Sequence, residues 1–189
     1  MGLREDDVIS ERYVALLRGI NVGGKNLVSM KELAAMFTEA GCSEVETYIQ
    51  SGNVVFSADN AVVKGLAARI SQEIEARFGC AVPVLLRSAV EMRMIVEGNP
   101  FLAKCVAVEL LHVSFLANVP TDAMVAALDT ARSPGDRFTV RGREVYLELG
   151  NGMGKTKLTN AYFDSKLKTV STARNWRTVL KLLELVEKR

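Results

Sequence analysis

Residues 13–26, YVALLRGINVGGKN, decide the first half of the fold, because an apolar run leads directly into a loop of glycines, amides and cations. The run from Tyr13 to Ile20 is apolar at successive positions, which is typical of a strand buried on both faces. Glycine permits the left-handed backbone of tight turns, and the polar loop residues have little to offer a core. The sequence therefore predicts a central strand that ends in a polar loop suited to an anion or a polar ligand.

The elements that follow this loop alternate in a regular order. Ser29 and Glu32 form a capping box at the start of a helix that Gly41 ends. Pro83 favours a sheet edge for the last strand of the series, because proline lacks a ladder donor. The resulting βαββαβ order is that of a ferredoxin-like unit, whose fourth strand lies at an edge. We expect a helix over 30–40, strands at 44–50 and 53–58, a helix over 60–78 and a strand at 81–86.

The rest of the chain repeats this order without repeating its residues. The predicted fold is therefore α+β, with two packed ferredoxin-like (βαββαβ) halves plus a C-terminal helix. Residues 12–87 form the first half, 88–104 a helical connector, and 105–189 the second half with the C-terminal helix. The elements expected here are helices over 88–97, 120–131, 159–167 and 173–188, and strands at 106–117, 137–141, 144–149 and 168–171.

Topology brings the first polar loop to a second polar stretch. In a βαββαβ unit, the end of strand one and the tip of the following hairpin share one rim of the sheet, so both stretches should meet there. The glycines and asparagines have an alternative interpretation as tight turns, because both residue types accept positive φ. The candidate ligand-binding residues of this rim are Arg18, Asn21, Gly23, Gly24, Lys25, Asn26, Ser51, Gly52 and Asn53.

The second half offers two further candidate stretches. Residues 150–157, GNGMGKTK, resemble a phosphate loop, but three residues rather than four separate the glycines of the motif, so we expect only a looser anion cradle with Lys155 and Lys157. Residues 172–177, TARNWR, are predicted to open the last helix, capped by Thr172 or Asn175. Arg174 and Arg177 would then lie beside free helix donors, together with Asn175, in an anion pocket.

Several kinds of chemistry find little support. His112 is the only histidine and fits a satisfied histidine within a strand. Three cysteines without C-x-x-C spacing favour a reducing cytoplasm over a disulfide scaffold, and with one histidine they predict no metal site. We expect no cofactor. No apolar run reaches the roughly 18–20 residues that span a bilayer, and no signal peptide opens the chain, so we expect no membrane partner.

Charge is distributed unevenly although the net charge is only +2. Residues 132–181 hold eleven lysines and arginines against four acidic residues, a local balance of +7, whereas residues 1–100 have a balance of −3. Such a segment is either a solvated basic face or a landing surface for phosphates or an acidic partner.

Four ordered motifs, YVALLRGINVGGKN, YIQSGNVVF, GKTKLTNAYF and TARNWRTV, resemble those of the domain of unknown function 1697 family, over residues 13–185. The resemblance implies a two-part α+β protein with ferredoxin-like halves, and it carries no biochemical activity. The family's motif residues correspond here to Arg18, Gly19, Asn21, Gly23, Gly24, Ser51, Gly52, Asn53, Arg174, Asn175 and Trp176.

The leading hypothesis from the sequence is a cytoplasmic protein that binds a phosphate-bearing ligand, either a nucleotide or nucleic acid. The alternatives are a small-molecule enzyme of unknown reaction, with arginine or lysine as electrostatic stabiliser, and a protein-interaction module. No catalytic residue is identifiable, and the oligomeric state is left open.

Overall fold

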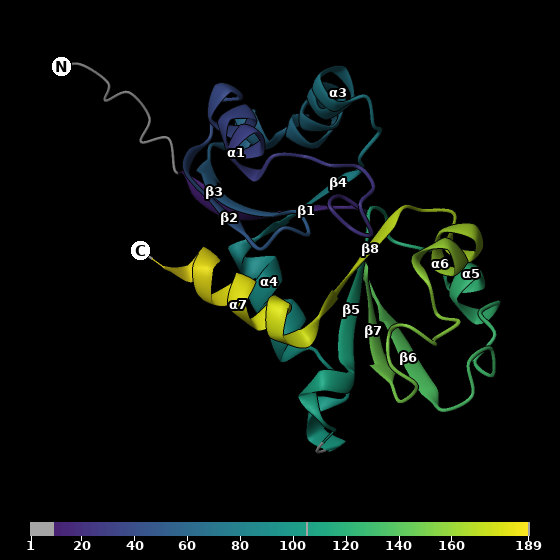
Figure 1. Ribbon diagram of the computed structural model, residues 1–189. Coiled ribbons are helices and arrows are strands. Elements are labelled where there is room, and N and C mark those ends of the chain that lie inside the picture. Colours follow the sequence, from purple (N-terminus) through teal and green to yellow (C-terminus); the bar gives the residue numbers. More distant parts are fainter. Residues whose placement is uncertain (1–9, 105, 189) are drawn as a thin grey trace. The chain divides into compact units, whose positions relative to one another are not determined.

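The computed structural model describes residues 10–104 and 106–188, and the chain divides into two compact units. The first unit comprises residues 1–89 with 185–189, and the second comprises residues 90–184. Each unit is built on a four-stranded antiparallel sheet with helices between its strands (Figure 1). This architecture confirms the predicted α+β class of two ferredoxin-like halves followed by a C-terminal helix. In the described part of the chain, no helix is both long and apolar enough to cross a bilayer.

The first unit has the strand order β2-β3-β1-β4, with all neighbours antiparallel. Its fourth strand lies at an edge, as Pro83 predicts, and Pro83 itself directly precedes that strand. The carbonyl of Pro83 accepts a hydrogen bond from the amide of Arg18 (3.0 Å). The elements are β1 (Glu11–Leu17), α1 (Met30–Glu39), β2 (Ser43–Tyr48), β3 (Asn53–Ala58), α2 (Asn60–Val63), α3 (Leu66–Phe78) and β4 (Val84–Ser88).

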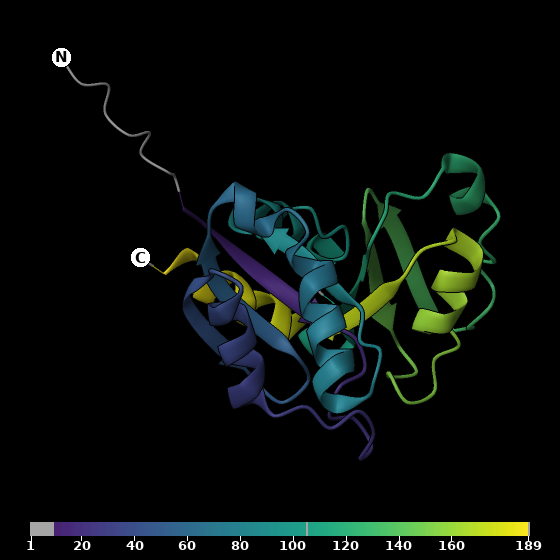
Figure 2. The same ribbon diagram turned by 90° about the horizontal axis from the view of Figure 1, so that it is seen from above.

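Helices α1 and α3 lie side by side over one face of the first sheet (Figures 1 and 2). The apolar stripes of both helices bury Phe37 and Ile70 against Ala15 and Phe56 of the central strands. Ser29 caps α1, because its hydroxyl accepts from the amide of Glu32 (3.3 Å). Ser29 therefore caps the helix at the predicted residue.

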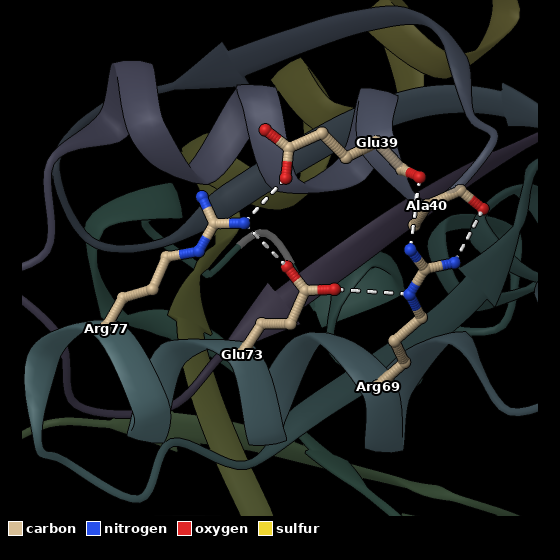
Figure 3. Close-up of polar contacts among 5 residues, drawn as sticks. All are labelled: Glu39, Ala40, Arg69, Glu73 and Arg77. Atoms are coloured by element: carbon tan, nitrogen blue, oxygen red, sulfur yellow. Dashed lines mark hydrogen bonds and ion pairs between the residues drawn. The ribbon is translucent and has the colours of Figure 1, made fainter.

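Polar contacts also join the two helices (Figure 3). Glu73 binds Arg69 and Arg77 on its own helix, at 3.2 and 3.1 Å, and Arg77 also reaches Glu39 of α1 at 2.6 Å. Arg69 donates to the carbonyls of Glu39 and Ala40 at the C-terminal end of α1, where a cation is favourable to the helix dipole.

The second unit repeats the topology with the order β6-β7-β5-β8. In this sheet, His112 of the central strand is paired with Leu147 of one neighbouring strand and with Asn175 of the other. The elements are α4 (Ala89–Glu97), η1 (Leu102–Lys104), η2 (Val108–Leu110), β5 (Leu111–Leu116), α5 (Asp122–Ala126), β6 (Asp136–Arg141), β7 (Glu144–Leu149), α6 (Asn160–Leu167), β8 (Ser171–Asn175) and α7 (Trp176–Glu187); the last residues of α7 belong to the first unit.

Three predicted elements of the second half differ from the structure. The central strand begins at Leu111, after a short 3-10 helix, rather than at Val106. Helix α5 ends at Ala126 instead of Ala131; beyond it, the Asp129 carboxylate accepts from the amide of Ala131 (2.9 Å), a local bond that competes with helix. The last strand covers Ser171–Asn175 rather than 168–171, so residues 173–175 are strand and not the start of the last helix, because they pair with β5.

Candidate functional site

The structure brings the two polar stretches of the first unit together. The amide of Leu17 donates to the carbonyl of Gly52 (2.8 Å), and the side-chain amide of Asn21 donates to the carbonyl of Gln50 (2.9 Å). Leu16 stands opposite Asn53 in the register of β1 and β3. The loop after β1 and the tip of the β2–β3 hairpin thus form one continuous surface, which we call the first rim (residues 18–28 and 49–53).

The asparagines of the first rim hold the backbone in place. Asn21 donates to the carbonyl of Val28 and accepts from its amide, both at 2.9 Å, in addition to its bond to Gln50. Asn26 donates to the carbonyl of Gly19 (3.0 Å). Asn53 is fully buried and donates to the carbonyl of Tyr48 (3.0 Å). These amides are engaged within the fold, so they shape the rim rather than offer themselves to a ligand.

The glycines of the rim serve two different needs. Gly23 and Gly24 both have positive φ, +60° and +72°, between the bridged pair Val22 and Lys25, which is the geometry of a two-residue hairpin turn. An added Cβ on either glycine would meet open space. Gly52 is different, because a Cβ there would stand 2.7 Å from the Cβ of Leu17.

The exposed side chains of the rim include one lysine and three large aliphatic residues besides the amides of Asn26 and Gln50. Lys25 is exposed, whereas Arg18 and Ser51 are half-buried. Val22, Leu27 and Ile49 expose 60 %, 68 % and 48 % of their surface. Large aliphatic side chains gathered on a rigid surface are more typical of an interface than of a phosphate site.

The loop over residues 150–158 surrounds a carboxylate of the chain itself. Asp136 accepts from the amide of Asn151 (3.0 Å), from its side chain (3.1 Å) and from the hydroxyl of Ser133 (2.6 Å). Burial opposes ionisation of Asp136, but these bonds and one from Thr156 outweigh it and lower its pKa. Lys155 and Lys157 are exposed on this loop. The loop is an anion cradle, and the anion it holds is internal.

Arg174 lies in β8 rather than in the first turn of the last helix, which corrects the predicted pair of helix-start arginines. Its guanidinium donates to the hydroxyl of Thr172 and the carbonyl of Ala173, both at 2.8 Å. The residue is buried, and burial lowers its pKa to about 10, so it is still charged at neutral pH. Its depth removes it from the surface on which a ligand would land.

Asn175 and Arg177 remain at the start of the last helix, as predicted. The side-chain oxygen Oδ1 of Asn175 accepts from the backbone amide of Thr178 (2.8 Å), so Asn175 is the N-cap of this helix. Both residues line a pocket of about 240 Å³ that also includes Val108, Glu109 and His112. We call it the α7 pocket. Arg177 forms an exposed ion pair with Glu109 at this site.

His112 gives the α7 pocket an acceptor of defined orientation. Its Nδ1 lies 3.3 Å from the carbonyl of Leu110; because a carbonyl only accepts, Nδ1 carries the proton and Nε2 carries the lone pair. The residue is 7 % exposed, and burial lowers its pKa below the ordinary value, so the ring is neutral at pH 7. Within the described residues, Nε2 has no hydrogen-bond partner.

Two other pockets are less suited to a ligand. One of about 330 Å³ lies between α4 and the β6–β7 hairpin, but its polar groups bind each other: Arg143 pairs with Glu91, and Tyr146 donates to the carbonyl of Ile95. The other, of about 400 Å³ at the start of α3, is lined by Lys64 and by Arg69, whose guanidinium is already bound to α1 and Glu73.

Comparison with known proteins places the chain in a family. The model of the family described as "Protein of unknown function (DUF1697)" matches residues 10–146. The chain belongs to the DUF1697 family. The matched stretch contains the first rim and His112, and it ends before the residues of α7.

A solved structure shares the fold of this DUF1697 member. The conserved bacterial protein SP0830 from Streptococcus pneumoniae superposes with a TM-score of 0.71 at 24% identity, over 95% of this chain and 100% of that one. No functionally curated protein matches the chain. The likeness supports the fold of the DUF1697 chain and carries no activity with it.

Sequence reasoning missed the part that His112 and Glu109 play in the α7 pocket. The prediction of a satisfied strand histidine holds for Nδ1 alone. A usable signal was the topology, because the start of β5 and the end of β8 share a rim in this fold, as the pairing of His112 with Asn175 shows. The predicted strand start at Val106 placed His112 in the middle of its strand and hid that signal.

Proposed function

We propose that this DUF1697 protein binds a phosphate-bearing ligand, a nucleotide or nucleic acid, with the phosphate at the α7 pocket. The observation that carries the proposal is the convergence of Arg177, the cap residue Asn175 and the first turn of a 12-residue helix on one cavity. The first amides of a helix lack partners within it and attract anions together with the helix dipole. Arginine adds planar donors that match phosphate oxygens.

Glu109 occupies the position that a phosphate would compete for. Its pair with Arg177 joins two side chains that are 59% and 70% exposed. Exposed ion pairs contribute little, about 0–1 kcal/mol, because water and salt screen them. A phosphate dianion that also meets helix donors therefore displaces the carboxylate at small cost.

The test is a calorimetric titration with inorganic phosphate and with adenosine monophosphate. Arg177→Ala should weaken binding roughly tenfold, since a charge-assisted hydrogen bond is worth about 1.5–3 kcal/mol. Glu109→Gln should strengthen it by removing the competing carboxylate. Lys64→Ala is the matched control, because Lys64 is an exposed cation at another helix start, and it should change nothing. Absent saturable binding, or an equal loss in both alanine variants, overturns the proposal.

The proposal includes a cytoplasmic location. Cys42 and Cys80 are free thiols, which is typical of proteins in a reducing compartment. Burial raises the pKa of Cys42 to about 11, so this thiol is protonated and unreactive at neutral pH.

The first rim favours a second candidate, a protein-interaction module. Its backbone is fixed by Asn21 and Asn26, and it exposes Val22, Leu27 and Ile49 beside Lys25. A rigid apolar surface loses little entropy on binding a partner. Self-association is tested by sedimentation of the wild type and of a Val22→Ser, Leu27→Ser double variant. A wild type that stays monomeric at high concentration excludes self-association.

A further inference from the structure

The α7 pocket combines donors and an acceptor, and this combination restricts its ligand. Among the lining residues, the guanidinium of Arg177 and the NH2 group of Asn175 can donate. The amide of Thr178 is already bound to Asn175, so only the amides before it are open to a ligand. Nε2 of His112 can only accept, because the bond from Nδ1 to the carbonyl of Leu110 fixes the tautomer. The phosphoryl group of a phosphate ester dianion has acceptors alone, so a donor for Nε2 has to come from another part of the ligand.

We infer that the ligand is a phosphate ester of a polyhydroxy compound, a class that includes ribonucleotides and sugar phosphates, and that one of its hydroxyls donates to Nε2 of His112. This inference rests on the proposed function and names the ligand class for the same site. The ester oxygen and carbon chain place a hydroxyl a few bonds from the phosphate, within the span of one pocket of about 240 Å³. Once a ligand covers the pocket, an acceptor left without a donor makes the site reject a ligand that lacks the hydroxyl.

Glu109 is already occupied and does not take this role. Its carboxylate pairs with Arg177 and moves aside when the phosphate binds there. By contrast, no described residue donates a hydrogen bond to Nε2 of His112, so this nitrogen is available as an acceptor. His112 is held on β5 and is only 7% exposed, so it is the residue that selects the ligand.

The experiment compares two probes of equal carbon length, glycerol 3-phosphate and n-propyl phosphate, which differ in their hydroxyls. The wild type should bind glycerol 3-phosphate roughly 3- to 10-fold more tightly, the gain expected for one neutral hydrogen bond. His112→Phe should abolish that ratio, because it removes the acceptor Nε2 that the hydroxyl would meet. His112→Gln, which keeps an acceptor oxygen, should retain part of the ratio and guards against loss through misfolding.

The ratio should also depend on pH. Protonation of His112 removes its acceptor, so the preference for the hydroxyl ligand should fade as the pH falls below 6.5, whereas ionisation of the phosphate affects both probes alike. The groups that face His112 are Glu109 from η2 and Asn175 and Arg177 from β8 and α7; Glu109 is present with both probes and cancels in the ratio.

The outcomes separate this inference from the proposed function. Equal affinities for the two probes, or a ratio that survives His112→Phe, overturn the polyhydroxy ligand while phosphate binding stands. If neither probe nor inorganic phosphate binds, the proposed function fails and the inference falls with it. A ratio that is lost in His112→Phe and at low pH supports the inference.

Discussion

Gly52 and Gly23 share a left-handed backbone, with φ of +83° and +60°, but not their surroundings. Gly23→Ala should destabilise the fold by about 1 kcal/mol, the conformational cost alone, because its Cβ meets open space. Gly52→Ala adds a clash with Leu17 and Ile20 and should lose roughly 2–5 kcal/mol. Urea unfolding of both variants measures the difference. Equal losses would mean that the hairpin tip can move away from Leu17.

His112 makes stability depend on pH. Its folded pKa lies below its ordinary value of 6.5, chiefly through burial, so the unfolded chain takes up the proton at a higher pH than the folded chain. The stability from neutral His112 is complete above about pH 6.5 and declines as the pH falls below that value. Urea midpoints between about pH 7.5 and 5.5 should fall in the wild type and flatten in His112→Gln. An equal decline of the urea midpoint in both proteins would contradict the assignment of this pH dependence to His112.

Residue identity predicted some of the site and misassigned other parts. The sequence predicts a capping role for Asn175, because its short amide side chain precedes an apolar stripe of helical period. The structure confirms this cap. Arg174 was placed beside it on the helix because five residues, Ser171–Asn175, are too few to show a strand period. Their strand character comes from pairing with Val113 and Phe115, nearly sixty positions away. The sequence does not display that pairing.

The element that holds Asp136 is a loop whose order depends on one carboxylate. Asp136→Ala leaves the amide of Asn151 and the hydroxyl of Ser133 without their acceptor, and should cost about 2–3 kcal/mol in urea unfolding. Its lowered pKa means that this stability is present above about pH 4 and is lost as the pH falls through the folded value. Asp122→Ala, exposed in the first turn of α5, is the control and should lose well under 1 kcal/mol. Similar losses in both would show that the loop does not need the carboxylate.

Most elements of the first half were predictable because they have local signals, but the helix expected over 60–78 is two helices, α2 and α3, separated at Gly65 (φ +87°). Ser29 begins a helix by capping, and Pro83 marks the edge strand. In the second half, α5 and β5 lack such signals at their ends. Beyond the end of helix α5, the carboxylate of Asp129 accepts from the backbone locally, and the amide of Asp129 donates to the hydroxyl of Tyr162 (2.9 Å). Tyr162 belongs to α6, so this contact is tertiary and the local sequence around α5 does not predict it.

At the scale of the whole molecule, the repeated βαββαβ order places the same pair of residue types at equivalent positions of the two units. Val14 of β1 faces Arg87 of β4, and Val113 of β5 faces Arg174 of β8, so each unit buries an arginine at the same place in its edge strand. The topological rule therefore predicted which ends of strands meet. The depth of each side chain follows from packing against other elements, which the rule does not contain.

The basic segment over 132–181 should not act as a continuous nucleic-acid surface, because several of its cations are already paired. A site confined to the α7 pocket contacts one or two phosphates. For a single-stranded oligonucleotide, a plot of the logarithm of the binding constant against the logarithm of the salt concentration should therefore have a slope of about −1. Fluorescence anisotropy between about 50 and 400 mM NaCl measures that slope. It should be similar for a mononucleotide and for an oligonucleotide of about ten residues, whereas a basic groove with five contacts would give about −3.5 or steeper. A steep, length-dependent slope would transfer the function from the pocket to the basic face. The pairs that reduce this face outside the α7 pocket are Arg137 with Glu148, Arg143 with Glu91 and Lys181 with Glu184.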